Sequence, residues 1–141
     1  MSDIQNFHAT TVDIEGRGVL IWGPSGSGKS TLALALIGLG AQLVADDQTF
    51  LRRSDDHLIA TCAPHLKGVI EARGVGLVRV PHVESTQICL LVDMNQTEDK
   101  RLPEHLTHDL LGISIDKIKS SRGIGFAPAL YYLVKNGKAD L

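Results

Sequence analysis

Short runs of apolar residues, or of alternating apolar and polar residues, fill the first two thirds of the chain and predict β-strands. Clusters of Gly, Asp or Ser residues separate most of these runs. The expected strands are residues 7–15, 19–22, 41–47, 49–53, 57–61 and 86–92. Residues 68–80 are also rich in strand-forming side chains, but they contain three glycines.

Two segments have the spacing of apolar residues that is typical of helices. This spacing predicts helices over residues 29–39 and 126–134. The first helix is expected to end near Leu39, because Gly38 and Gly40 favour helix termination. The remaining segments are expected as a short turn or helical piece at 64–67, a polar surface loop at 95–100, a helix at 104–111 and an unassigned stretch at 113–118.

The connection between the first two strands predicts their relative direction. Residues 16–18 read Gly-Arg-Gly and leave room only for a tight turn between the strands at 7–15 and 19–22. A turn this short joins antiparallel neighbours, whereas parallel strands need a crossover of about a dozen residues or more. We therefore expect an α/β fold with a mixed, largely antiparallel sheet and flanking helices.

Length and composition narrow the class of protein. The chain has 141 residues, 43% hydrophobic and 21% charged, so we expect residues 1–141 to form a single domain. The net charge of −2 argues against nucleic-acid binding, which requires a basic excess. No apolar run approaches the roughly 18 residues of a membrane span, and the N-terminus does not resemble a signal peptide. These features predict a cytoplasmic protein, in which Cys62 and Cys89 are buried thiols within apolar stretches.

The segment between the second strand and the first helix contains the most specific motif. Residues 23–30 match G-x-x-x-x-G-K-S in the strand, turn and helix order of a phosphate-binding loop, the P-loop or Walker A motif. Its glycines let backbone N–H groups surround a polyphosphate, and the following helix directs its N-terminal N–H groups at the same charge. A Gly/Ser linker is the alternative, but a linker does not need Lys29 and Ser30 at the start of a helix. The residues expected to bind nucleotide are Gly23, Pro24, Ser25, Gly26, Ser27, Gly28, Lys29, Ser30 and Thr31.

Acidic residues at strand ends are candidates for the chemistry. Asp46 and Asp47 end the strand at 41–47, where an enzyme with this loop places carboxylates that hold Mg²⁺ or receive a proton. Successive strand residues face opposite sides, so only one of the two is expected to point at the γ-phosphate. A turn that contains two aspartates by chance is the alternative, and Asp93, after the strand at 86–92, competes for the same role.

Three further polar residues have more than one interpretation. Glu71 and Arg73 are two positions apart, so in a strand they share a face, either above the phosphates or as a surface ion pair. His8 is a single histidine in the first strand, and from its position alone both a catalytic and a structural role are open.

Taken in order, these motifs resemble the catalytic domain of HPr kinase/phosphorylase, the bacterial enzyme that phosphorylates a serine of the phosphocarrier protein HPr. The resemblance covers about residues 7–115. It rests on His8 before Val-Asp-Ile-Glu-Gly-Arg-Gly, the loop at 23–30, the Asp-Asp pair after Leu-Val-Ala, Glu-x-Arg-Gly-x-Gly at 71–76, and Leu-Gly-Ile at 111–113. The resemblance also implies a P-loop core similar to that of phosphoenolpyruvate carboxykinase.

The resemblance implies a role for each matching residue. Asp47 is similar to the family's proton acceptor, with Asp46 in support, which favours Asp47 over Asp93. The other implied roles are catalysis by His8, Lys29 and Arg73, and magnesium ligation by Ser30 and Glu71.

Both ends of the chain depart from the longer members of the family. The chain starts at the catalytic domain, so we expect no separate N-terminal domain, as in the short alphaproteobacterial type. Residues 119–125 replace the family's Pro-Gly-Arg-Asn-like segment, so Arg122 matches the catalytic arginine only loosely. The chain ends soon after the helix at 126–134, without the segment associated with dephosphorylation. Kinase activity is therefore expected ahead of phosphorylase activity.

The resemblance implies a serine protein kinase that uses ATP and Mg²⁺, acts on HPr of the phosphotransferase system, and has the reverse phosphorolysis as a second reaction. It also implies a homo-oligomer, a hexamer in the family. The alternative is a nucleotide-binding regulatory module of the same fold without turnover. Such a module is expected to lack acid–base residues, yet His8, Asp47, Glu71 and Arg73 are all present.

Overall fold

The structure is a computed structural model that describes residues 3–139. Its strands are β1 (Gln5–Phe7), β2 (Ala9–Ile14), β3 (Arg17–Trp22), β4 (Gln42–Ala45), β5 (Thr49–Ser54), β6 (His57–Thr61), β7 (Val69–Ala72), β8 (Gly76–Arg79), β9 (Ser85–Thr97), β10 (Leu106–Leu110) and β11 (Ile113–Ser120). Its helices are α1 (Lys29–Gly38), α2 (Phe126–Asn136) and a short 3₁₀ helix, Pro64–Leu66. Within residues 3–139, neither α-helix has the length and apolar character needed to cross a membrane.

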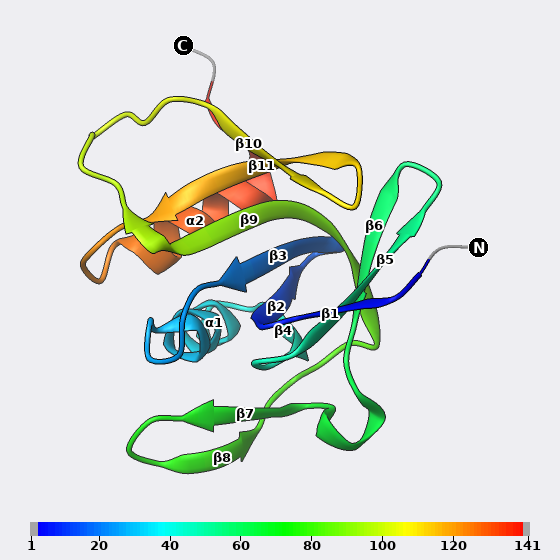
Figure 1. Ribbon diagram of the computed structural model, residues 1–141. Helices are drawn as coiled ribbons and strands as arrows, with labels where there is room; N and C mark the ends of the chain where they lie inside the picture. The colour runs from blue at the N-terminus through cyan, green and yellow to red at the C-terminus, as the bar shows by residue number, and fades with distance from the viewer. Residues whose placement is uncertain (1–2, 140–141) are drawn as a thin grey trace.

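Nine strands form one mixed sheet in which the long strand β9 is central (Figure 1). Seven of them follow the order β1-β5-β6-β9-β3-β2-β4. The second half of β9 also pairs in parallel with β11, which forms a hairpin with β10. The strands β7 and β8 form a separate two-stranded sheet, which lies at the bottom of Figure 1.

The expected antiparallel pair at the start of the chain is confirmed. β2 and β3 are antiparallel, with Thr11 opposite Leu20, while β3 and β9 run parallel. The turn between β2 and β3 places Glu15 and Gly16 at positive φ, and the Asp13 carboxylate accepts a hydrogen bond from the Gly16 N–H at 3.1 Å. The fold is thus α/β with a mixed sheet, as the tight turn predicted.

Alternate residues of the central strands fill two apolar layers, one on each face of the sheet. Val19 and Ile21 of β3 pack with residues of α1 and α2, while Leu20 between them packs with residues of β5, β6 and β11. This division follows from the period of two along a strand. Both helices therefore cover one face of the sheet, and the strands themselves close over the other face.

A buried leucine of α1 tests the helix-covered layer. Leu36 is fully buried, so replacement by alanine is expected to lower the free energy of unfolding by about 2–5 kcal/mol, because it leaves a cavity. Leu39, at the end of α1, is 42% exposed and provides the matched control, and its alanine variant is expected to lose much less. Urea unfolding of both variants measures the difference. Equal losses of unfolding free energy in the two variants contradict the burial of Leu36 in this layer.

The sequence interpretation was wrong or incomplete after residue 94. The expected loop at 95–100 begins as strand, because β9 continues to Thr97 through its pairing with β11. The expected helix at 104–111 is the strand β10, which pairs with β11 over its whole length. Leu111 and Gly112 have positive φ and form the hairpin turn, and the unassigned stretch at 113–118 lies in β11. Cross-strand pairing, rather than local helical spacing, decides this region.

Two smaller expectations also need correction. Cys62 is buried as expected, but Cys89 is exposed, because it occupies an outward position in the alternating first half of β9. Arg73 does not share a strand face with Glu71, since β7 ends at Ala72 and Arg73 lies in the turn to β8. The expected helix at 126–134 is confirmed as α2.

Candidate active site

The loop between β3 and α1 forms an open cradle. Gly26 and Gly28 have φ values of +80° and +98°. No heavy atom lies within 4 Å of the position that a Cβ atom would take at Gly26, and at Gly28 that position is 3.7 Å from the Met94 Cε atom. Gly23 is different, because a Cβ there would lie 2.7 Å from the Met94 Cβ atom. The loop therefore packs against Met94 of β9 on one side and is open at Gly26.

The N-terminus of α1 directs unpaired backbone groups toward this cradle. Gly28 is its N-cap residue, with no side-chain cap and no acidic residue in the first turn. The first N–H groups of an α-helix have no partner within the helix, and together with the helix dipole they favour an anion. An anion bound at the loop would satisfy these N–H groups.

Lys29 places its ammonium group at the same loop. The residue is only 6% exposed, and its Nζ donates hydrogen bonds to the carbonyl oxygens of Gly23 at 2.9 Å and Pro24 at 3.2 Å. The loop backbone thus holds a buried positive charge beside the cradle.

The Asp46 carboxylate connects three parts of the fold. Its Oδ1 accepts hydrogen bonds from the hydroxyl groups of Ser30 at 2.6 Å and Thr10 at 3.1 Å. Its Oδ2 accepts one from the backbone N–H of Glu71 at 3.1 Å. Asp46 therefore joins the first turn of α1, the strand β2 and the otherwise separate β7–β8 hairpin.

Asp47 turns away from Asp46 and contacts His8. Its φ of +68° is in the left-handed region, which aspartate and asparagine adopt more readily than most residues. One carboxylate oxygen lies 2.9 Å from His8 Nε2, and the two side chains are 61% and 54% exposed. The Asp47 carboxylate is thus oriented by a partner but remains accessible to a second molecule.

Thr10 links the two aspartates and was not identified from the sequence. This fully buried residue donates to the Asp46 carboxylate and accepts a hydrogen bond at 3.1 Å from the backbone N–H of Asp47. A threonine in an alternating strand gives no sequence signal for such a role. The hydroxyl of the adjacent Thr11 instead lies 2.9 Å from the Thr49 hydroxyl.

The oxygen atoms near the loop suit a magnesium ion. Ser30 supplies a hydroxyl beside the Asp46 carboxylate, and both are the hard oxygen ligands that Mg²⁺ prefers. The Glu71 side chain is exposed, and its backbone N–H is the group that contacts Asp46. Within residues 3–139, no three His, Cys, Asp or Glu residues form a cluster that could hold a metal. Mg²⁺ commonly keeps several waters and substrate phosphates with only one or two carboxylates, so the donor set fits this ion.

Neither of the two candidate arginines joins this cluster. Arg73 lies in the turn between β7 and β8, and Arg122 lies between β11 and α2. Both are exposed, and in the described part of the chain neither forms an ion pair with a carboxylate.

Asp93, the competing carboxylate, is engaged elsewhere. Its Oδ1 accepts hydrogen bonds at 2.9 Å from both the backbone and the side-chain amide of Asn95, and its Oδ2 lies 3.4 Å from Lys117 Nζ. Burial alone would raise the pKa of the Asp93 carboxyl, but the hydrogen bonds and the Lys117 charge outweigh burial and hold the pKa below its ordinary value. Asp93 therefore links β9 to β11 through Lys117.

Comparison with known proteins finds similar sequences. A family model described as "HPr Serine kinase C-terminal domain" matches residues 1–122. Proteins named HPr kinase/phosphorylase from Burkholderia lata and Burkholderia multivorans are 38% identical over 123 residues, which covers 79% of this chain. This chain spans only 38% of the length of those relatives.

A solved structure extends the similarity to the fold. The structure of the HPr(Ser) kinase/phosphatase from Coxiella burnetii superposes with a TM-score of 0.80 and 32% sequence identity. The match covers 94% of this chain and 95% of that one. With the family model covering most of the chain, these similarities show that the protein belongs to the family of HPr serine kinase C-terminal domains.

Proposed function

We propose that residues 1–141 form the catalytic domain of a protein kinase that transfers the γ-phosphoryl group of ATP to a serine of HPr. The observation that carries this proposal is the hydrogen-bond path from Ser30, beside the open loop, through Asp46 and Thr10 to Asp47. This path connects the segment that carries an accessible carboxylate to the start of the helix that follows the loop. The named relatives are kinases of HPr, which supports the same substrate for this chain.

The residues from Gly23 to Thr31 hold the nucleotide in this proposal. The loop glycines and the first turn of α1 supply N–H donors for the phosphates, and Lys29 supplies a positive charge. Ser30 and Glu71 hold Mg²⁺, with Asp46 hydrogen-bonded to the Ser30 hydroxyl. The ion neutralises negative charge on the phosphate groups.

Asp47 is the base. It accepts the proton of the HPr serine hydroxyl while the serine oxygen forms a bond to the γ-phosphorus and the bond from that phosphorus to the β,γ-bridging oxygen breaks, which releases ADP. His8 holds the Asp47 carboxylate in place at 2.9 Å. In the phosphorolysis reaction an oxygen of inorganic phosphate forms a bond to the phosphorus of phosphoserine while the bond from that phosphorus to the serine oxygen breaks. Asp47 returns the proton to the serine oxygen, and the products are serine and pyrophosphate.

The exposed arginines Arg73 and Arg122 complete the proposed catalytic set. Both lie in connecting segments at the surface, where their guanidinium groups can meet a second protein or its phosphoserine. A homo-oligomer, hexameric as the resemblance implies, and a cytoplasmic location are part of the same proposal.

The direct test is incubation with γ-labelled ATP, Mg²⁺ and the HPr protein of the same organism. Label is expected on wild-type HPr and not on an HPr variant in which the acceptor serine is alanine. Binding of ATP without any transfer contradicts the kinase proposal and supports the regulatory module instead. Addition of inorganic phosphate to labelled HPr then tests phosphorolysis.

Thr10 is expected to act as a positioning residue. The variant Thr10→Val keeps the shape of the side chain but removes the donor to Asp46 and the acceptor for the Asp47 N–H. We expect kcat to fall by about tenfold, with KM for ATP nearly unchanged, because an unpaired buried polar group costs roughly 1–3 kcal/mol. Thr10→Ser retains the hydroxyl and should restore kcat. Equal losses of kcat in both variants contradict this role.

A further inference from the structure

The β7–β8 hairpin carries two apolar side chains that are exposed to solvent. Val75 in its turn is 80% exposed, and Leu77 of β8 is 78% exposed. Leu77 lies directly opposite Glu71 of β7, the residue whose backbone N–H donates to the Asp46 carboxylate at 3.1 Å. One strand pair therefore connects these apolar side chains to the candidate active site.

The hairpin has one face in the core and one face outside it. Ile70 of β7 is fully buried in the same apolar layer as Leu32 and Leu36 of α1. Glu71 is the next residue along β7, so Glu71 and its partner Leu77 lie on the opposite face. Leu77 is thus presented to solvent by a hairpin that Ile70 anchors in the core.

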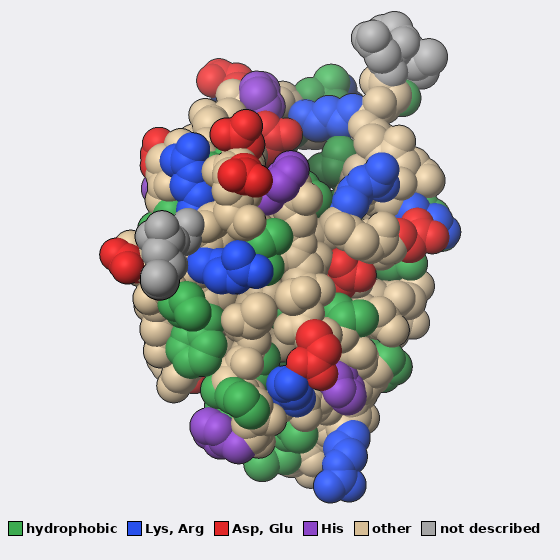
Figure 2. Space-filling model, turned by 90° about the vertical axis from the view of Figure 1, so that its right-hand side faces the viewer, with side chains coloured by type: hydrophobic (Ala, Val, Ile, Leu, Met, Phe, Trp, Pro, Cys, Tyr) green, Lys and Arg blue, Asp and Glu red, His purple; other side chains and the backbone are tan. Residues whose placement is uncertain are grey.

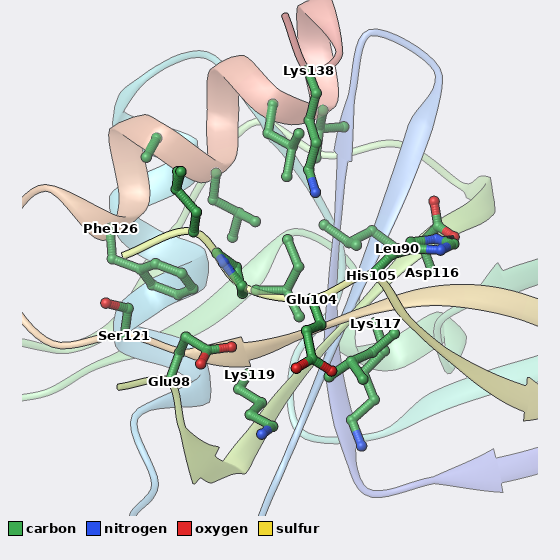
Figure 3. A pocket seen from close by; sticks show the side chains of 18 of the residues that line it. Leu90, Glu98, Glu104, His105, Asp116, Lys117, Lys119, Ser121, Phe126 and Lys138 are labelled. Atoms are coloured by element: carbon green, nitrogen blue, oxygen red, sulfur yellow. Dashed lines mark hydrogen bonds and ion pairs between the residues drawn. The ribbon is translucent and has the colours of Figure 1, made fainter. Parts of the chain in front are cut away.

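Another exposed apolar side chain, Leu102, lies far from this hairpin. It lines a cavity of about 770 Å³ between α2, β11 and the segment that leads from β9 into β10. Figure 2 shows a hollow near the top of the molecule, whereas the hairpin lies at the bottom of Figure 1. The basic side chains of the cavity do not converge, because Lys138 points into it and Lys119 points away (Figure 3). Val75 and Leu77 do not line this cavity.

A protein substrate has to cover the surface around Asp47. The Asp47 side chain is 61% exposed, and a protein–protein contact covers about 800 Å² on each partner, much more than one carboxylate offers. Apolar side chains at the centre of such a contact, together with arginines, usually contribute most of the affinity. The hairpin offers this combination, since Arg73 and Arg79 are exposed on it beside Val75 and Leu77.

We propose that Val75 and Leu77 contact HPr and select it as the protein substrate, with Arg73 and Arg79 at the border of the contact. The complementary surface of HPr is apolar and lies near its acceptor serine. This inference rests on the proposed function, because it assigns the docking of the substrate of that same site.

The double variant Val75→Ser/Leu77→Ser tests the contact in phosphorylation assays with γ-labelled ATP. We expect KM for HPr to rise by about tenfold or more, while KM for ATP and kcat change by less than about twofold, because the removed side chains contact only the protein substrate. Val75→Ile/Leu77→Met keeps both side chains apolar and should retain the wild-type KM for HPr.

Leu102→Ser/Tyr132→Ser is the matched control, because it removes two exposed apolar side chains outside the hairpin. It should leave KM for HPr unchanged. The proposal is overturned if the hairpin variant keeps the wild-type KM for HPr, or if the control variant shows the same rise. Melting temperatures are recorded for all variants, and Leu77→Gln alone repeats the test if the double variant unfolds.

Calorimetry with HPr distinguishes failure of this inference from failure of the kinase proposal. Transfer to HPr by the wild type, with equal HPr affinity in the wild type and Val75→Ser/Leu77→Ser, overturns the contact and leaves the kinase proposal intact. Binding of HPr by the wild type without transfer, lost in the same variant, supports the contact and overturns the kinase proposal. A wild type that neither binds nor phosphorylates HPr overturns both.

Discussion

Replacement of Asp47 by asparagine is expected to lower the rate of HPr phosphorylation by about 10²–10⁴-fold, the usual contribution of a general base. The amide cannot accept the serine proton as a carboxylate does, but it keeps the size of the side chain. Asparagine also tolerates the left-handed backbone at this position, where φ is +68°, better than alanine does. The loss should therefore reflect chemistry rather than a disturbed loop. Measurement of single-turnover transfer from γ-labelled ATP gives the rate.

Asp55 provides the matched control for this variant. It also has a positive φ, +55°, and is exposed, but it lies in the turn between β5 and β6. Asp55→Asn should leave the transfer rate unchanged. ATP affinity should be unchanged in both variants, because Asp47 contacts His8 rather than the loop. Substantial transfer by Asp47→Asn would falsify the assignment of Asp47 as the base.

Replacement of Lys29 by methionine is expected to weaken ATP binding and to lower the transfer rate by roughly 10²–10³-fold, because a buried positive charge beside the phosphates is lost. Methionine keeps most of the length and the apolar stem of lysine. Two carbonyl oxygens, those of Gly23 and Pro24, lose their Lys29 hydrogen bonds, so the melting temperature is recorded in parallel. Calorimetry with ATP and Mg²⁺ measures the affinity.

Lys135 is a suitable control for the lysine substitution. It lies in the last turn of α2, with its Nζ 5.9 Å from the centre of the Tyr131 ring, and it does not contact the loop. Lys135→Met should leave both ATP affinity and transfer unchanged. If Lys29→Met binds ATP as the wild type does and transfers phosphate normally, Lys29 has no role in the site. Comparison of Lys29→Met with Asp47→Asn separates the loss of nucleotide binding from the loss of proton transfer.

A part of the site could be predicted from the sequence only where its residues lie close together along the chain. The glycine-rich loop, Lys29 and Ser30 are contiguous, so their motif could be found from spacing alone. The choice between Asp47 and Asp93 could not be made from the pattern, since each follows an apolar strand. In the structure Asp93 is held by Asn95 and Lys117. That difference is a consequence of which strands pair, and it has no counterpart in the local sequence.

The fold also has features that the local sequence predicts and features that it does not. The tight turn after β2 predicted an antiparallel pair, because a short turn allows no other connection. The segment at 104–111 was wrongly expected as a helix, and in the structure Leu106 and Leu110 are the first and last residues of β10. Their actual environment is the β10–β11 ladder, where they lie opposite Lys117 and Ile113. A partner strand supplies hydrogen bonds that local periodicity does not reveal.

The sequence by itself determined most strands, both α-helices, the loop and the presence of the aspartate pair, because each is encoded within a few consecutive residues. Only the tertiary structure decided that Asp46 binds Ser30, Thr10 and the Glu71 N–H, which are 16, 36 and 25 positions away along the chain. It also decided that Asp47 faces His8 and that Arg73 lies in a turn. Contacts between distant segments depend on the packing of the whole sheet, so local patterns could not specify them.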